Sequence, residues 1–207
     1  MHRSFFLVAL CSLLTISSFA QRTLSLRSNM EGLQFTLLGG TSSWSSDYFT
    51  NLDDLEPLGL GGGVQVGYGI NQRLMIFARY DGYSYRQKLS WDTFSMQNIG
   101  LGLRWSFSGT TQRFRPFLEA GYTHIGLTIN PVLFNGDLYK YSLGGGSVSF
   151  GGGVQAFVTP KVNVSLGALW AAGTFSSFQV NNQGLTDKPD VVQFRLSLGV
   201  TYCLSLD

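Results

Sequence analysis

Charged side chains are scarce in this chain, and their scarcity limits what the protein can be. Asp, Glu, Lys and Arg make up 13% of the 207 residues, about half the roughly 25% of a typical soluble domain. The formal net charge is +2 and no block of basic residues occurs, so nucleic acid is not expected as a partner. Glycine, with 26 residues, and aromatic side chains, at 14%, are abundant instead.

Long apolar runs and cysteines are also rare. After residue 20 no stretch of 18 consecutive apolar residues occurs, which argues against a transmembrane helix in the rest of the sequence. Residues 1–20 have the pattern of a secretory signal peptide, with Arg3, an apolar run, and small residues at Ser18 and Ala20 before Gln21. Cleavage there would remove Cys11 and leave Cys203 alone, so no intramolecular disulfide is expected.

The sequence GGGVQ occurs twice, at residues 61–65 and 151–155. A glycine-rich phosphate loop precedes a helix, and a P-loop places a Lys and a Ser or Thr after its last glycine. Neither feature follows these runs, so we expect no nucleotide and no other cofactor. Both runs instead lie in stretches where apolar and polar residues alternate, which is the pattern of a β-strand.

Alternation with a period of two extends over most of the remaining sequence and predicts an all-β fold. The last stretch is the clearest, because Phe194, Leu196 and Leu198 alternate with Arg195 and Ser197. We predict eight strands, with the GGGVQ runs in the second and the sixth. Their ranges are 31–41, 60–70, 73–85, 96–107, 115–126, 147–158, 161–172 and 191–204.

The predicted connections alternate in length. Those after strands 2, 4 and 6 are short, whereas those after strands 1, 3, 5 and 7 run about ten to twenty residues, an asymmetry typical of an up-and-down outer-membrane barrel. Aromatic residues of the long loops are candidate contact anchors: Trp44, Tyr48, Phe49 and Trp91. Acidic residues gather in the first long loop without the spacing of a calcium loop: Asp47, Asp53, Asp54 and Glu56.

The composition of the two strand faces predicts which face points outward. The polar face carries mainly Gly, Ser, Thr, Asn and Gln, which suits a crowded lumen, while the bulky apolar face suits lipid. We therefore predict an eight-stranded antiparallel transmembrane β-barrel, preceded by a cleaved signal peptide. Aromatic residues near the strand ends should form two interface belts: Tyr68, Tyr80, Trp105, Phe107, Tyr122, Trp170 and Tyr202.

Two sets of residues are predicted to fill the lumen. Buried charges need partners, so the charged residues of the polar face should form one network. One Arg of that network would lack a carboxylate and rely on water, Gln, Asn or Tyr. The glycines of the repeated motif should let side chains from opposite strands cross, with the glutamines as hydrogen-bond partners. The network comprises Arg79, Asp81, Arg104, Glu119 and Arg195; the glycine and glutamine wall comprises Gly61, Gly63, Gln65, Gly151, Gly153 and Gln155.

With these features the chain resembles the small outer-membrane β-barrel families of Gram-negative bacteria, such as the OmpA transmembrane domain, OmpX, OmpW and Opa-like proteins. The resemblance rests on the strand count, the loop asymmetry, the segment Arg115–Tyr122 and the last strand. That strand is similar to the signal read by the barrel-assembly machinery, at Ser197, Gly199, Tyr202 and Leu204. Leu204 stands where relatives have an aromatic residue. The resemblance implies a short periplasmic segment at 21–30, a barrel domain at 31–207, and lipid and lipopolysaccharide partners.

Several functions remain open at this stage. The first is a structural or surface-interaction barrel with a filled, non-conducting lumen and no catalysis, which acts through its long loops on an extracellular or envelope protein partner. The second is an OmpW-like transporter of small apolar molecules, lined by Phe77, Tyr83, Tyr85, Phe117, Ile125 and Phe157. A lipid A-modifying enzyme or omptin-type protease would need a positioned nucleophile beside His124. An accessory subunit of an envelope machine would use a smooth stripe near Gly152 and Ala156.

Overall fold

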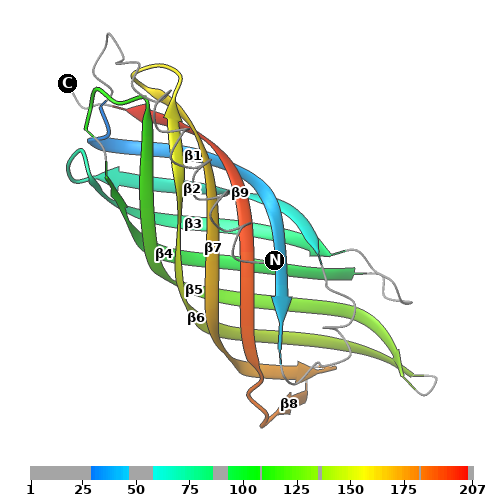
Figure 1. Cartoon of the computed structure of the whole chain (residues 1–207). Helices are drawn as coiled ribbons and strands as arrows, with labels where there is room; N and C mark the ends of the chain where they lie inside the picture. Colours follow the sequence, from blue (N-terminus) through cyan, green and yellow to red (C-terminus); the bar gives the residue numbers. More distant parts are fainter. Residues whose placement is uncertain are drawn as a thin grey trace, which may run out of the picture.

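A computed structural model of the chain describes residues 29–46, 58–85, 93–107, 109–134, 137–181 and 183–204. These residues form an antiparallel sheet closed into a barrel (Figure 1), in which β9 pairs with both β7 and β1. Among them, no helix is long and apolar enough to cross a membrane. The strands are β1 (Gly32–Ser45), β2 (Gly59–Gly69), β3 (Leu74–Tyr85), β4 (Thr93–Ser106), β5 (Phe114–Phe134), β6 (Asp137–Phe157), β7 (Val162–Val180), β8 (Gln183–Leu185) and β9 (Asp190–Leu204).

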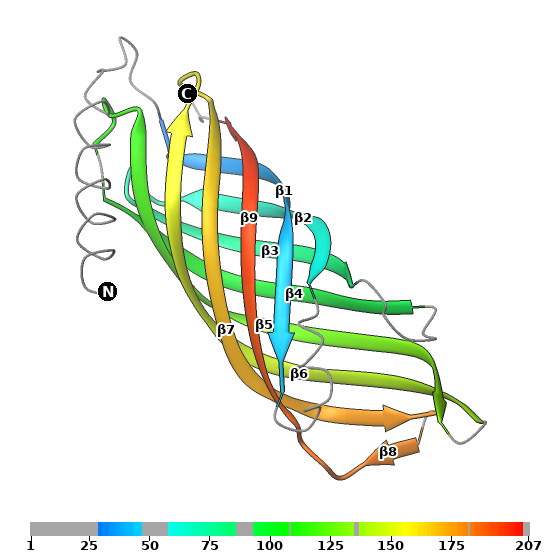
Figure 2. The same ribbon diagram turned by 45° about the vertical axis from the view of Figure 1, so that its right-hand side comes forward.

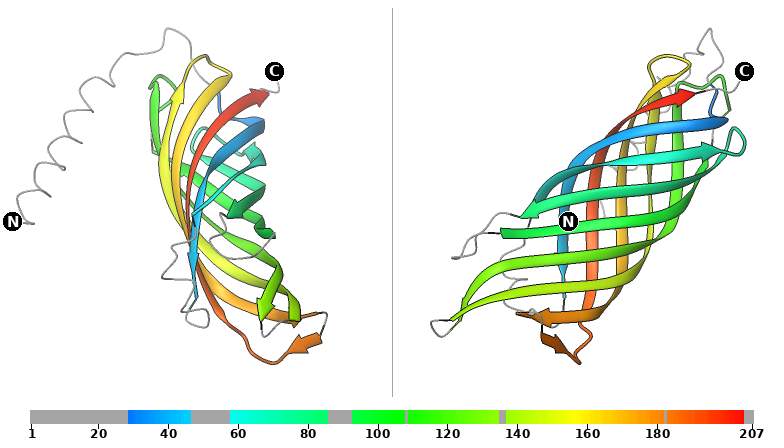
Figure 3. Two further views of the ribbon diagram at one scale, coloured as in Figure 1. Left: turned by 90° about the vertical axis from the view of Figure 1, so that its right-hand side faces the viewer. Right: turned by 180° about the vertical axis from the view of Figure 1, so that it is seen from behind.

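Eight of these strands form the barrel wall, which confirms the predicted fold class. Each wall strand pairs with the next wall strand along the chain, and β8 pairs only with the end of β7. Figures 2 and 3 show the wall strands inclined to the barrel axis, as closure of a small sheet requires. Strand β2 shows how the alternating sequence builds the wall: Val64, Val66 and Tyr68 are exposed by 42–47%, whereas Gln65 points inward and is 2% exposed.

Short turns join the strands at one end of the barrel, which we call the short-turn end. The turn at residues 70–73 is held by Asn71, whose Oδ1 accepts hydrogen bonds from the N–H groups of Arg73 and Leu74, each at 2.9 Å. Thr159 plays the same part in the turn before β7, where its Oγ1 accepts from the N–H groups of Lys161 and Val162. Local side-chain acceptors of this kind stabilise tight turns.

At the opposite end the strands run further than the sequence predicted. Residues 127–146 were expected to form a long loop, but β5 continues to Phe134 and β6 begins at Asp137, and the two strands stay paired to these ends. Pro131 lies at a register shift between Ile129 and Val132, and an irregularity of this kind accommodates a residue that cannot donate to the ladder. In Figure 1 the β5–β6 and β7–β8 hairpins reach beyond the ends of β2, β3 and β4.

The glycines of the repeated motif lie close to the neighbouring strands. A Cβ at Gly63 would lie 2.7 Å from Cα of Asp81, its pairing partner on β3, and a Cβ at Gly151 would lie 2.8 Å from Cα of Leu169 on β7. The same neighbouring strands limit Gly61 and Gly153. At Gly61 and Gly63 the neighbouring strand, rather than a side chain from across the lumen, therefore limits the space. At Gly153 a Cβ would also lie 2.8 Å from the ring of Phe117, so this glycine does make room for a side chain. The glycines of the motif let adjacent strands approach closely where the wall bends.

Candidate functional site

Glu119 is the centre of an ion network in the middle of the lumen. Its carboxylate pairs with Arg104 at 2.7 Å and with Arg79 at 3.1 Å, and these residues come from β5, β4 and β3. Gln65 of β2 joins them, because its Oε1 accepts hydrogen bonds from Nη2 of Arg79 at 2.7 Å and of Arg104 at 3.4 Å. The guanidinium of Arg104 also lies over the ring of Phe117, 4.2 Å from its centroid. The network therefore connects four neighbouring strands from the inside.

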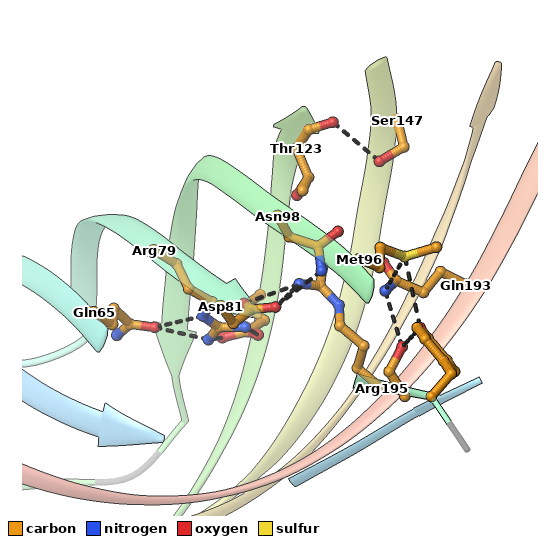
Figure 4. Close-up of polar contacts among 12 residues, drawn as sticks. Gln65, Arg79, Asp81, Met96, Asn98, Thr123, Ser147, Gln193 and Arg195 are labelled. Atoms are coloured by element: carbon orange, nitrogen blue, oxygen red, sulfur yellow. Dashed lines mark hydrogen bonds and ion pairs between the residues drawn. The ribbon is translucent and has the colours of Figure 1, made fainter. Parts of the chain in front are cut away.

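A second ion pair crosses the lumen. Nη1 of Arg195 on β9 donates to both carboxylate oxygens of Asp81 on β3, at 2.9 and 3.0 Å (Figure 4). Two strands, β1 and β2, separate β9 from β3 along the wall, so this pair spans the interior rather than a strand interface. Asn98 donates to Asp81 from β4 at 3.1 Å. The side chains of Arg79, Glu119, Arg195 and Asp81 are each less than a tenth exposed.

All five residues of the predicted charge network take part in these ion pairs, but the partners of the arginines differ from the prediction. We expected one Arg to lack a carboxylate. Instead, Glu119 accepts from two guanidiniums at once, and Asp81 serves Arg195. A buried charge loses its hydration, and only an ion pair or hydrogen bonds can offset that loss. By pairing with both guanidiniums, Glu119 provides a counter-charge for each of them.

Two residues of the inner wall depart from the predictions. Arg115 was not included in the network, yet it is fully buried and its guanidinium lies 4.4 Å from the ring centroid of Phe157. Arg115 lies two residues before Phe117 and four before Glu119, on the same face of β5. The alternation of the sequence could therefore have identified Arg115 as a lumen residue. Gln155, predicted to act like Gln65, is fully buried but neither of its amide atoms has a hydrogen-bond partner within the described part of the chain.

Above the ion network, at the hairpin end, the lumen is filled by apolar side chains. Trp44, expected in a loop as a contact anchor, lies in β1 and packs here with only 4% of its surface exposed, so that expectation is wrong. Tyr85 stacks on Phe94 with centroids 4.7 Å apart. The cluster comprises Trp44, Tyr83, Tyr85, Phe94, Met96, Ile125, Leu127, Ile129, Leu143, Phe175, Phe178 and Val191.

Polar contacts tie the apolar cluster to the network beneath it. Gln193 of β9 donates to Oγ of Ser42 at 2.9 Å and to Sδ of Met96 at 3.0 Å (Figure 4). The hydroxyls of Ser42 and Tyr85 are 3.0 Å apart. Strands β4 and β9 face each other across the barrel, so the contact between Gln193 and Met96 closes the lumen at this level. Residues proposed to line a transport path, including Tyr83, Tyr85 and Ile125, are part of this packed interior.

The space left beside the ion pairs is small. A cavity of about 10 Å³ is lined by residues of the network together with Asn98, Thr123 and Ser149. This volume corresponds to about one water molecule.

Comparison with known proteins classifies the chain. Residues 6–200 match the model of the "Outer membrane protein beta-barrel domain" family. The chain belongs to this family. No curated protein sequence matches it. Among solved structures, Neisserial surface protein A has a TM-score of 0.63 at 19% identity, over 84% of this chain and 98% of the other. The attachment invasion locus protein Ail of Yersinia pestis has a TM-score of 0.51 at 15% identity, over 84% and 100%.

As a member of an outer-membrane family, the protein lies in the outer membrane with its apolar wall toward lipid. The short turns face the periplasm and the hairpin end faces outside the cell, as expected from the loop asymmetry. The seven aromatic residues predicted for the interface belts all point outward and are 44–60% exposed. They are Tyr68, Tyr80, Trp105, Phe107, Tyr122, Trp170 and Tyr202.

The C-terminal strand of this outer-membrane barrel closes the wall. Leu204 pairs with Leu33 and Gly199 with Leu38 along β1. Ser197 and Gly199 face inward, whereas Tyr202 and Leu204 face lipid, 46% and 41% exposed. Recognition of these four residues by the assembly machinery stays a prediction.

Other predicted residues of the barrel fall outside the lumen or outside the described ranges. His124 is exposed on the lipid-facing side of β5. Within the described part of the chain, no three His, Cys, Asp or Glu residues are grouped as metal ligands. The following calls lie outside the described residues: the predicted signal peptide at 1–20 and the loop residues Asp47, Tyr48, Phe49, Asp53, Asp54, Glu56 and Trp91.

Proposed function

We propose that this outer-membrane barrel is sealed and acts, without catalysis, through the surface that it presents outside the cell. The observation that carries the proposal is the filled lumen. Buried ion pairs link β3 to β5 and β3 to β9, and an apolar cluster lies above them. Opening a path through these layers would expose unpaired charges and separate packed apolar side chains, both of which are costly.

The outward-facing end supports a role in contact with other molecules. Its β5–β6 hairpin and the short β7–β8 hairpin extend beyond the neighbouring strands (Figure 3). Asn181, with a positive φ of 49°, fixes the end of β7 to β6: its N–H donates to the carbonyl of Lys140, and its Oδ1 accepts from the Lys140 N–H at 2.8 Å. A projecting element that is held firmly loses little freedom on binding a partner.

The proposed partners are lipids and lipopolysaccharide around the wall, the barrel-assembly machinery during biogenesis, and an extracellular or envelope protein at the projecting end. The names of the two similar structures, a surface protein and an attachment and invasion protein, accord with this proposal. At 19% and 15% identity their likeness to this chain is one of fold.

Single-channel conductance in a planar bilayer tests the sealed lumen. We expect no steady current from the refolded protein. Arg79→Ala and Arg104→Ala should admit water beside Glu119 and give a measurable current, whereas the matched control Arg73→Ala, in an exposed turn, should stay silent. Steady current from the unaltered protein would overturn the proposal and favour transport through the lumen.

A further inference from the structure

An apolar groove crosses the outside of the barrel in its periplasmic half. Its volume is about 710 Å³. Five of its lining residues pair side by side across five strands, from β1 to β5. The row runs Leu33, Tyr68, Ile76, Leu103 and Ala120.

Small residues make this part of the wall hollow. Ala78 and Ala120 stand on the lipid-facing side among larger neighbours such as Leu101 and Leu103, and Gly102 and Gly121 form part of the floor. Gly102 pairs with Phe77, whose ring lies 2.6 Å from where a Cβ of Gly102 would stand. The same ring lies 5.1 Å from the guanidinium carbon of Arg79, so it backs the thin wall from the lumen side.

The turn on the periplasmic side of the groove carries a cation. Arg73 is exposed in the turn that joins β2 to β3 and precedes Ile76 by three residues, which is about 10 Å along an extended strand. The other two short turns also carry one exposed cation each, Arg113 and Lys161, and none of the three turns contains Asp or Glu. Glu31, beside the β1 edge of the groove, is the exposed carboxylate nearest in sequence to the row.

We propose that the groove binds one phospholipid of the periplasmic leaflet, with an acyl chain along the row from Leu33 to Ala120 and an anionic headgroup at Arg73. The groove is apolar where acyl chains lie, and the cation stands where the headgroups begin. A second copy of the chain is a less suitable occupant. A two-fold axis along the membrane normal would place the cationic turns of both copies at the same rim.

Trp105 and Trp170 provide a direct test. Trp105 lies two residues beyond Leu103 of the groove, Trp170 lies on β7 away from it, and both are exposed to lipid, by 44% and 51%. Two variants would each retain one of these tryptophans, with the others changed to Phe and folding checked by heat stability on unboiled gels. Each is refolded into phosphatidylcholine vesicles containing a minor fraction of brominated phosphatidylglycerol or, for comparison, brominated phosphatidylcholine.

The brominated anionic lipid should quench Trp105 more strongly than the brominated zwitterionic lipid, while Trp170 should show no preference. Arg73→Gln should lower the preference at Trp105 about fivefold, because one basic residue near a membrane surface contributes about that factor. Ala120→Leu, which fills the groove, should lower it as well, and Glu31→Gln should raise it. The matched control Lys161→Gln removes a cation from a turn away from the groove and should leave the preference unchanged.

Three results would overturn the proposal. Equal quenching of Trp105 by the two lipids would mean that no anionic lipid is selected. Equal losses in Arg73→Gln and Lys161→Gln would mean that the whole rim attracts anions without a site. Protection of Trp105 from both quenchers, with a dimer trapped by cross-linking, would mean that a second copy occupies the groove.

Discussion

At the scale of single residues, Glu119 has the largest predicted effect on stability. It is buried between Arg79 and Arg104 and pairs with both. Glu119→Gln keeps the shape but leaves two buried guanidiniums without a counter-charge. We expect a loss of about 3–5 kcal/mol in the free energy of unfolding, measured by urea titration of the protein in lipid vesicles.

The matched control for this change is Glu31→Gln, which removes an exposed carboxylate at the start of β1. It should change the free energy of unfolding by no more than about 0.5 kcal/mol. If the two variants unfold at the same urea concentration, the ion network does not stabilise the barrel.

Gly63 gives a second test at this scale. A Cβ at this position would overlap the backbone of β3, whereas a Cβ at Gly39 of β1 would meet nothing within 4 Å. Gly63→Leu, and to a lesser degree Gly63→Ala, should reduce the heat-stable barrel seen on unboiled gels because β2 and β3 cannot pair as closely. Gly39→Ala should assemble like the unaltered protein. Normal assembly of Gly63→Leu would show that the wall does not require this close approach.

At the scale of elements, the extended β5–β6 hairpin divides into two parts. Among the side chains that the structure describes, the apolar cluster reaches Ile129 on β5 and begins at Tyr141 on β6. Replacing residues 133–138 by a two-residue Asn-Gly turn, which keeps the pair of Val132 and Tyr139, should preserve folding and heat stability, measured by circular dichroism and gel mobility. A large loss of stability in this shortened variant would mean that the projecting part belongs to the folded core.

The part of the hairpin end that fills the lumen should respond differently. Phe175 of β7 is fully buried in the apolar cluster, and Phe175→Ala removes its ring. We expect a loss of about 3–5 kcal/mol in the free energy of unfolding. Leu138→Ala, at an exposed position of the same hairpin end, is the control and should have little effect. Similar values for both would contradict tight packing inside the barrel.

The elements also show what the sequence could and could not predict. Alternation depends on neighbouring residues, so it correctly placed the wall strands and their lipid-facing sides. The hairpin at 127–146 was missed because its Gly144, Gly145 and Gly146 weaken the strand pattern, while the apolar partners that hold it come from β1, β3 and β7. Pairings such as Arg195 with Asp81 depend on how far the strands are staggered on closure, which no local pattern encodes.

At the scale of the whole molecule, closure of the wall and filling of the lumen are linked. The ion pair between Arg195 and Asp81 joins the last strand to the third, and β9 completes the wall only by pairing with β1. The lumen can therefore acquire its cross-lumen contacts only when the barrel has closed. We expect Arg195→Ala to assemble more slowly than Arg73→Ala, measured as the rate at which heat-stable protein appears during refolding. Equal rates for the two variants would mean that barrel closure does not depend on the ion pair inside the lumen.

The buried thiol of Cys203 allows that closing step to be timed chemically. This side chain points inward from β9 and is 1% exposed in the finished barrel, near the amide of Asn163 on β7. We expect the same sulfur to be open to solvent before β9 meets β1. Pulses of a maleimide reagent would be given during refolding of the chain from Gln21 onward. The reagent would label Cys203 in every molecule in which β9 has not yet paired with β1, and would not label molecules whose barrel has closed.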